Sequence, residues 1–240
     1  MTVQWVVGAI GIAAASFVMG LAGFGIALVG LALLPFVMAP ATAVVLLTLY
    51  ALVFAVVIAV QLRRDITPGP LATLLAGSVL GTPAGVWILA SVSSAVLNRL
   101  IGAVLIAVVV LEWRGLFPQR LAGRGWGLAA GVLAGFGGGA VGTPGPPVVV
   151  WCTAQGWAPR TMKANLQAFF VVNQGVILTS YWWAGLLTPE VWRVAAAFAL
   201  PALAGVAVGM ALFRRIDPVG FRRVVFGLLF LSGTALLLHG

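Results

Sequence analysis

Long apolar runs, separated by short charged or proline-containing breaks, make up almost the whole chain. The runs of the first half are Val3–Val37, Thr42–Gln61, Leu71–Ala90 and Leu100–Trp113. A helix needs about 20 apolar residues, within a range of roughly 17–25, to cross a membrane. Val3–Val37 is longer than one span and is interrupted at Gly20–Gly25, so we interpret it as two short segments. The pattern therefore predicts five membrane segments in this half.

The same order of segments begins again after a basic linker. The second half contains Trp126–Gly135, a Gly/Pro-rich piece that ends at Trp151, then Lys163–Leu187, Val191–Phe213 and Phe221–Leu238. We predict an all-α polytopic membrane protein with two repeats, residues 1–113 and 126–240, joined by a linker at 114–125 within one transmembrane domain. With Gly/Pro-broken or re-entrant helices in each repeat, the chain would have about 8–10 membrane segments.

Internal sequence identity supports a duplication. Leu21–Gly25 reappears as Leu133–Gly137 at an offset of 112 residues, and 9 of the 18 positions from Leu21 to Met38 are identical at that offset. A second match pairs Gly81 and Gly85 with Gly205 and Gly209, and Arg99 with Arg223. Chance identities among apolar residues do not account for three glycines and a proline in register.

Composition excludes a water-soluble globular protein. The chain is 62% apolar and only 7% charged, against about 25% charged residues in an average soluble domain. Thirteen Lys and Arg residues against four Asp and Glu give a net charge of +9. A nucleic-acid-binding protein would cluster these cations on one face, whereas here they stand singly or in pairs between apolar runs. We therefore interpret the charge as a topology signal and expect no nucleic-acid partner.

The positive-inside rule orients the two repeats. If each broken pair of segments returns to its starting side, eleven of the thirteen cations share one side and only Arg99 and Arg193 lie opposite. The shared loops carry Arg63, Arg64, Arg114, Arg120, Arg124, Arg160, Lys163, Arg214, Arg215, Arg222 and Arg223. A single kinked span in place of each pair would divide the cations almost evenly. The biased arrangement predicts inverted repeats, a cytoplasmic linker and both termini on the periplasmic or extracellular side, as in many secondary transporters.

The chain lacks the residues that several kinds of functional site require. Cys152 is the only cysteine and His239 the only histidine, which excludes an internal disulfide and argues against a Cys or His metal site and a His-based triad. The four acids, Asp65, Glu112, Glu190 and Asp217, fall in loops or near helix ends, and there is no Walker motif. No serine stands at a spacing from Lys163 that suggests a Ser–Lys catalytic dyad. We therefore expect no enzyme, no metal and no cofactor.

The Gly/Pro-rich segments are candidates for an anion site. Within Phe136–Pro147 each interior glycine costs about 0.8–1.0 kcal/mol relative to alanine and each proline about 3 kcal/mol, which predicts a turn rather than a continuous helix. Backbone amides at a helix start bind anions. The alternative is that the glycines only permit close helix packing. The candidate residues are Gly23, Phe24, Gly25, Gly137, Gly138, Gly139, Gly142, Thr143 and Pro144.

The helix predicted after this segment carries polar side chains. Its candidates for substrate binding are Lys163, Asn165, Gln167, Asn173 and Gln174. Polar groups within a membrane usually face a cavity or the bundle interior. Lys163, Gln167 and Gln174 fall near one helix face, whereas Asn165 lies to the side. Lys163 could instead be an ordinary loop charge at the boundary, and the amides could serve hydrogen bonds between helices.

Two Gly-Phe-Gly elements, Gly23–Gly25 and Gly135–Gly137, each begin a Pro-containing apolar segment. Together with Gly81-Thr82-Pro83-Ala84-Gly85, they make the chain resemble the TauE/SafE family of sulfite exporters. The resemblance implies an inner-membrane carrier, in contact with the lipid bilayer, for small sulfur-containing anions such as sulfite, sulfoacetate or other organosulfonates. Ile26 and Ala27 replace Gly138 and Gly139 in the first copy, so we give the second copy more weight.

The function expected from these observations is secondary transport, with export by alternating access and substrate bound midplane at the Gly-rich segments. A passive anion channel, a carrier of small carboxylates and, less well supported, a membrane-embedded enzyme are the alternatives. Ion-coupled uptake is the alternative direction of transport, and the sequence is compatible with a homo-oligomer.

Overall fold

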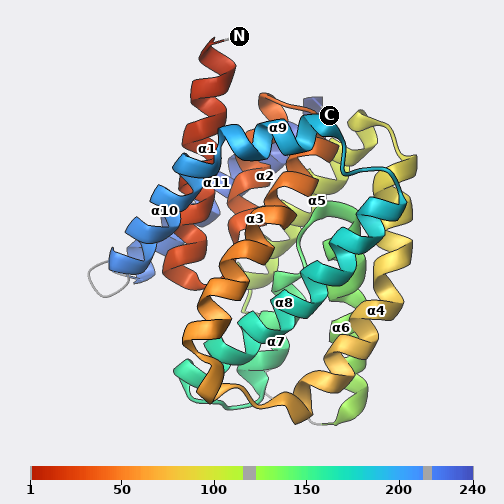
Figure 1. Ribbon diagram of the computed structural model, residues 1–240, viewed down its shortest axis with the longest axis vertical. Helices are drawn as coiled ribbons and strands as arrows, with labels where there is room; N and C mark the ends of the chain where they lie inside the picture. Colours follow the sequence, from red (N-terminus) through yellow and green to blue (C-terminus); the bar gives the residue numbers. More distant parts are fainter. Residues whose placement is uncertain (1, 116–122, 213–217, 240) are drawn as a thin grey trace. The chain divides into compact units, whose positions relative to one another are not determined.

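The computed structural model of the chain describes residues 2–115, 123–212 and 218–239 and is built from helices (Figure 1). The helices are α1 (Thr2–Ala22), α2 (Ile26–Leu33), η1 (Leu34–Phe36), α3 (Pro40–Gln61), η2 (Arg63–Asp65), α4 (Pro68–Ser91), α5 (Ser94–Trp113), α6 (Arg124–Val141), α7 (Gly145–Ala154), α8 (Pro159–Trp183), α9 (Pro189–Ala197), α10 (Ala199–Leu212) and α11 (Pro218–His239). The described residues form no β-strand, and the predicted all-α class is confirmed.

Part of the predicted charge distribution falls outside the described residues. This applies to the middle of the linker with Arg120, to Arg214, Arg215 and Asp217, and to the side chains of Arg124 and Arg222.

The chain divides into two compact units that do not coincide with the two halves of the sequence. The first unit contains residues 1–50, 92–116 and 187–240, and the second contains residues 51–91 and 117–186. The first half thus supplies the later part of α3, η2 and α4 to the second unit, and the second half supplies α9, α10 and α11 to the first unit. The division into repeats at 1–113 and 126–240 stays a prediction.

Most predicted segments have close counterparts among the helices, and the first break is where the sequence indicates it. α1 ends at Ala22 and α2 begins at Ile26, with Gly23 and Gly25 between them at φ angles of 79° and 92°. Only glycine adopts such angles without strain. The second break was predicted too early, because α6 continues through Phe136 to Val141 and the chain turns only at Gly142–Pro144.

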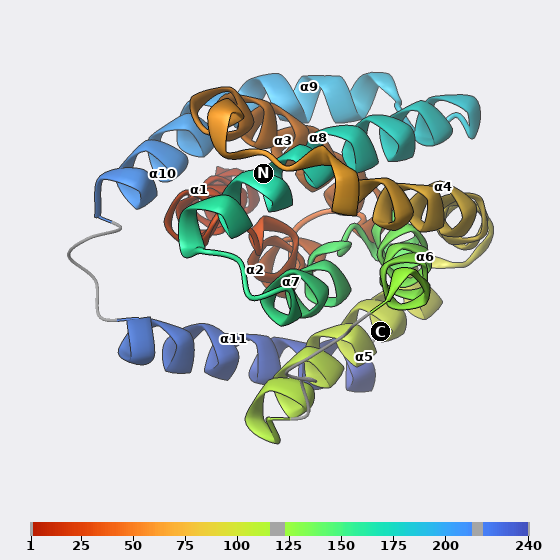
Figure 2. The same cartoon turned by 90° about the horizontal axis from the view of Figure 1, so that it is seen from below.

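Close packing against α4 explains why the glycine-rich part of α6 stays helical. Gly77, Gly81 and Gly85 of α4 face the backbone of α6, and Gly131, Gly135 and Gly139 of α6 face the backbone of α4. These glycines recur every four residues in both helices, which run parallel and lie side by side (Figure 2). Small residues at such spacing let membrane helices approach closely, so packing offsets the low helix propensity of glycine.

The first unit contains a similar parallel pair. Gly205 and Gly209 of α10 lie against the backbone of α1 at Ala13 and Phe17, and Gly20 of α1 lies against Val206 of α10. The two pairs therefore join a helix from one half of the sequence to a helix from the other half by the same kind of contact.

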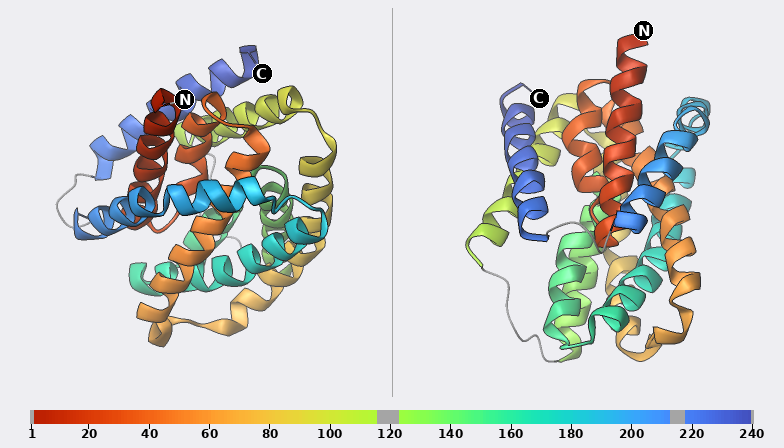
Figure 3. Two further views of the ribbon diagram at one scale, coloured as in Figure 1. Left: turned by 45° about the horizontal axis from the view of Figure 1, so that its top comes forward. Right: turned by 90° about the vertical axis from the view of Figure 1, so that its left-hand side faces the viewer.

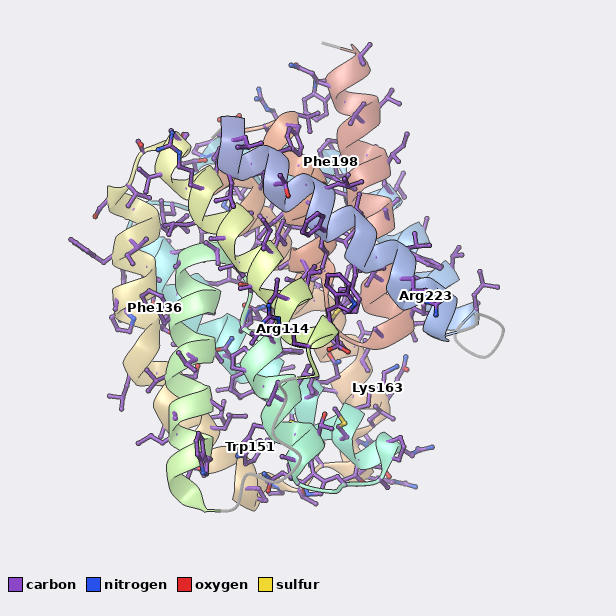
Figure 4. The ribbon with its side chains drawn as sticks, turned by 180° about the vertical axis from the view of Figure 1, so that it is seen from behind. Arg114, Phe136, Trp151, Lys163, Phe198 and Arg223 are labelled. Atoms are coloured by element: carbon purple, nitrogen blue, oxygen red, sulfur yellow. The ribbon has the colours of Figure 1, made fainter. Side chains whose placement is uncertain are left out.

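The last helices of the two halves, α5 and α11, also pack together in the first unit. Gly102 lies beside Leu237 and Gly233 beside Ile106, so the two helices are antiparallel. Arg114, at the end of α5, and Arg223, near the start of α11, lie toward the same end of this pair (Figure 4). Both ends of the chain belong to the first unit, and the start of α1 and the end of α11 lie toward the same end of it (Figure 3).

One predicted segment, Val191–Phe213, is bent. α9 and α10 meet at Phe198 with an angle of 52° between them. Pro201 has no N–H to donate to Ala197, and its ring crowds the carbonyl of that residue, which ends α9 there. The predicted segment is therefore present as a bent pair of helices.

Four described helices, Val3–Ala22, Pro40–Gln61, Pro68–Ser91 and Ser94–Trp113, are long and apolar enough to cross a membrane. The bent pair α9–α10 would bring the number to five, and Ile26–Phe36, Gly125–Val141 and Arg223–Leu238 are shorter apolar helices. Helix α8, although 25 residues long, is not among the four, since it carries a lysine and four side-chain amides. These helices indicate a multi-pass membrane protein.

Candidate functional site

The interruption between α6 and α7 is a compact turn in the second unit. Gly142 ends α6 at a φ angle of 66°, and its N–H donates to the carbonyl of Gly138 at 2.9 Å. The N–H of Thr143 donates to the carbonyl of Gly137 at 3.1 Å. Thr143 and Pro144 are buried. The turn is therefore closed by its own backbone, and the Thr143 amide is already engaged.

Helix α7 offers fewer amide donors than the sequence suggested. Its first three residues are Gly145, Pro146 and Pro147, and of these only Gly145 has an N–H. The positive end of the helix dipole remains at this position. Fewer backbone N–H groups are therefore present at the start of α7 than at an ordinary helix start, and an anion site built from backbone amides stays a prediction.

The glycines of the turn differ in what surrounds them. A side chain on Gly139 would begin 2.8 Å from the carbonyl oxygen of Thr82 in α4, so its lack of a side chain serves packing. A side chain on Gly138 would begin 2.7 Å from Cδ1 of Ile177 in α8. The packing alternative thus accounts for the position of Gly139, and Gly138 is already covered by Ile177. Only Gly137 has a less crowded side, where a Cβ would lie 3.3 Å from the Thr143 carbonyl oxygen.

One face of α8 packs against α4 through two side-chain amides. Oδ1 of Asn165 accepts the N–H of Thr67 at 2.7 Å, and its Nδ2 donates to Oγ1 of Thr67 at 2.6 Å. Both ends of this amide are thus bound to the residue that precedes α4. Two turns further on, Asn173 accepts a hydrogen bond at Oδ1 from the hydroxyl of Ser78. The positions 165 and 173 lie on the same face of α8.

A second face of α8 lies against the α6–α7 turn. Ile177 approaches Gly138, and the hydroxyl of Tyr181 donates to the carbonyls of Gly138 and Gly139 at 3.1 and 2.9 Å. Gln174 and Gln167 precede Tyr181 by 7 and 14 residues, so all three fall on one stripe of the helix. The spacing that predicts a shared face for Gln167 and Gln174 thus extends to Tyr181.

The buried polar atoms without a hydrogen-bond partner include two on neighbouring residues of α8. These two are Nδ2 of Asn173 and Oε1 of Gln174, on side chains that are 1% and 3% exposed. An amide of this kind costs about 1–3 kcal/mol when it is left unsatisfied in a protein interior. A ligand, an ion or an ordered water can complete such a group. The neighbouring Ser78, Thr82, Thr143 and Gln167 are also buried.

A basic group of residues lies at the start of α8. Arg160 is paired with Asp65 of η2, with Nε and Oδ2 2.8 Å apart, and Arg63 and Arg64 of η2 are exposed. Lys163 is half-buried one turn further along α8. Eleven residues, or about 16 Å along the helix axis, separate Lys163 from Gln174. The charged residues and the buried amides therefore lie at different positions along the axis of α8.

The first-half candidates, Gly23, Phe24 and Gly25, belong to the first unit, and the others belong to the second. The N–H of Gly23 donates to the carbonyl of Met19 at 2.8 Å, and Phe24 is half-buried. The following residues of α2, Ile26, Ala27 and Leu28, all have an N–H, unlike the start of α7. The first break therefore offers more backbone donors, and the second more polar side chains.

Sequence reasoning missed three residues of the second unit. Ser78, Thr67 and Tyr181 were not singled out, although each contacts a predicted residue. A serine inside the apolar run of α4 was the available signal for Ser78, and the 7-residue spacing from Gln174 was the signal for Tyr181. Over the residues described, no three His, Cys, Asp or Glu side chains gather in a way that could hold a metal ion.

Comparison with known proteins identifies the family. Residues 7–236 of the 240-residue chain match the family described as "Sulfite exporter TauE/SafE". No curated protein and no solved structure matched the chain. A match over nearly the whole length establishes membership, and the fold agrees with a multi-pass membrane protein. The chain therefore belongs to the TauE/SafE family of sulfite exporters, which are membrane transporters of small sulfur-containing anions.

Proposed function

We propose that the protein exports small sulfur-containing oxyanions, such as sulfite, sulfoacetate or other organosulfonates, across the inner membrane by alternating access. The substrate would bind beside the α6–α7 turn and the polar stripe of α8. The observation that carries this assignment is the buried Nδ2 of Asn173, an amide donor that has no hydrogen-bond partner. The family supplies the class of substrate.

The charge distribution supports an anion as the substrate. The helices α4, α6, α7 and α8 contain no Asp or Glu, so an oxyanion at Asn173 would meet no acidic side chain on them. The amide of Asn173 can donate two N–H groups. Lys163 and the arginines of η2 would attract anions toward the start of α8.

The membrane potential gives the direction of transport that we propose. An inside-negative potential drives each negative charge outward by about 2.3 kcal/mol per 100 mV. Export of a sulfur oxyanion would therefore need neither ATP nor a carboxylate proton relay.

Several structural features support an inverted duplication, on which the alternating-access proposal rests. The two breaks are 119 residues apart, counted from Gly23 to Gly142, and the same 119 residues separate Pro40 and Pro159, the first residues of α3 and α8. The ungapped offset of 112 instead pairs the first break with residues inside α6. The matched final helices α5 and α11 run antiparallel, as two inverted copies would.

The proposed topology places both termini on the periplasmic side. It agrees with the position of Arg114 and Arg223 at one end of α5–α11 and with the Arg160–Asp65 pair, which brings the basic loops at 63–65 and 160–163 together. A C-terminal reporter that is active only in the cytoplasm should be silent, and an active reporter would contradict this orientation.

The proposal is tested by counterflow in proteoliposomes. Vesicles loaded with unlabelled sulfite and diluted into trace ³⁵S-sulfite should accumulate label transiently above equilibrium, because a carrier exchanges the two. A channel would equilibrate the label without an overshoot. Acetate-loaded vesicles provide the matched control for a carboxylate carrier, and an overshoot with acetate but not with sulfite would reject the sulfur-anion assignment.

A further inference from the structure

The chain has two tyrosines, and both hydroxyls donate to backbone carbonyls at helix interruptions. In the second unit, Tyr181 donates to Gly138 and Gly139 at the end of α6. In the first unit, the hydroxyl of Tyr50 donates to the carbonyl of Ala195, 2.6 Å away, near the end of α9. Each interruption thus receives a donor from a different helix, α8 in one unit and α3 in the other.

The geometry of the α6–α7 turn explains why a donor is needed there. In a continuous helix the N–H of Thr143 would donate to the carbonyl of Gly139. At the turn this N–H donates instead to Gly137. The carbonyl of Gly139 thereby loses its helical partner, and the hydroxyl of Tyr181 replaces it at 2.9 Å.

The same reasoning applies to the bend between α9 and α10. Ala195 is among the last four residues of α9, whose carbonyls have no N–H partner within the helix. Tyr50 supplies a hydroxyl donor from α3. Tyr181 is 0% exposed and Tyr50 8% exposed, so water does not readily substitute for either hydroxyl.

We infer that Tyr181 and Tyr50 are positioning residues. Tyr181 holds the conformation of the α6–α7 turn, and Tyr50 holds that of the α9–α10 bend. Tyr181 fixes the α6–α7 turn beside Gln174, and so sets the shape of the proposed substrate site. Tyr50 fixes the α9–α10 bend in the other unit, where it controls the angle between these two helices. The part of this inference that concerns transport rests on the proposed function.

Phenylalanine substitutions test the hydroxyls alone, since Phe retains the ring. The variants are Tyr181→Phe and Tyr50→Phe. Thr179→Val is the matched control, because Oγ1 of Thr179 donates to the carbonyl of Gly175 at 2.8 Å within the uninterrupted α8. All three variants lose one hydroxyl bonded to a backbone carbonyl, but only the tyrosines serve an interruption.

Amide hydrogen exchange of the substrate-free protein is the first measurement. Exchange within residues 138–148 should accelerate about tenfold in Tyr181→Phe, and within residues 194–202 in Tyr50→Phe, which corresponds to the loss of about one hydrogen bond. Thr179→Val should leave both segments unchanged. If both tyrosine variants exchange like the control, the positioning role is refuted. This arm needs no substrate and is therefore independent of whether sulfite is transported.

Sulfite binding and counterflow form the second arm. Tyr181→Phe should weaken sulfite binding about three- to tenfold, since it loosens the turn that shapes the site. Tyr50→Phe should leave the dissociation constant within about twofold and change the turnover rate instead. Affinity and turnover equal to those of Thr179→Val in both variants would overturn the inference. Absence of sulfite transport by the unaltered protein would reject the proposed function and leave the exchange result to decide this one.

Discussion

The hydroxyl of Ser78 in α4 donates a hydrogen bond to Oδ1 of Asn173 in α8. This bond engages the oxygen of the amide and leaves its Nδ2, which has no partner, as the available donor. A buried N–H₂ group oriented by a neighbouring hydroxyl is suited to an oxyanion, which only accepts hydrogen bonds. The pair therefore links the packing of α4 on α8 to the proposed chemistry of the site.

Replacement of Gln174 by leucine should raise stability and weaken binding together. The buried Oε1 of Gln174 has no partner, and leucine of similar size removes the cost of about 1–3 kcal/mol. We expect a higher melting temperature for substrate-free Gln174→Leu. Because leucine also lacks the N–H₂ donor of the glutamine amide, we expect a smaller sulfite-induced thermal shift. Gln155→Leu is the control, since Nε2 of Gln155 donates to the Trp151 carbonyl and its loss should not stabilise. A Gln174→Leu variant that melts lower would contradict the account.

The glycine contact between α4 and α6 should tolerate no side chain. A Cβ on Gly81 would overlap the carbonyl of Val132, so Gly81→Ala should destabilise the protein by about 1–3 kcal/mol or more. Gly175 of α8 has no heavy atom near its Cβ position. Gly175→Ala should therefore be neutral or stabilise by up to about 1 kcal/mol through helix propensity. Thermal melting in detergent compares the two, and equal losses would argue against close packing of α4 on α6.

Asn165 should act on stability more than on binding. Asn165→Ala removes two hydrogen bonds to Thr67, and we expect a loss of about 1–3 kcal/mol in the free energy of unfolding. The sulfite KM should change by less than about twofold. A large increase in KM with unchanged melting would instead make Asn165 a substrate ligand, as the sequence alone suggested.

A paired substitution separates packing from substrate contact at Gly138. Because Ile177 covers the position where a Cβ would lie, Gly138→Ala should reduce transport by disturbing packing. Shortening the neighbour in Gly138→Ala/Ile177→Ala should restore at least about half of the transport rate. A double variant that is folded, as judged by its melting curve, yet inactive would show that Gly138 faces the substrate.

The sequence predicts the helices well because apolar length and breaking residues report directly on membrane segments. The first break is readable at Gly23 and Gly25, where positive φ angles require glycine. The second is less readable, because Gly135 and Gly139 look like helix breakers until their contact with α4 is known. Glycine is thus ambiguous in a membrane protein, since it serves both turns and close packing.

The candidate site is only partly predictable for a related reason. The spacing of Gln167 and Gln174 predicts a shared face, and this is a local property of one helix. The roles of Asn165 and Asn173 depend on Thr67 and Ser78, which lie almost one hundred residues away in the sequence. No periodicity within α8 distinguishes an amide bound to Thr67 from one with an unsatisfied Nδ2.

The most direct test of the central claim is ³⁵S-sulfite counterflow by Asn173→Asp. The carboxylate has nearly the same shape and can still accept the hydrogen bond from Ser78, but it replaces the N–H₂ donor with negative charge. Asn98→Asp is the matched control, since Asn98 also has a buried amide atom without a partner, its Oδ1, but lies on α5 in the other unit. We predict that Asn173→Asp abolishes the overshoot, by at least about a hundredfold in rate, while Asn98→Asp retains it. Unimpaired counterflow by a folded Asn173→Asp protein would contradict the account.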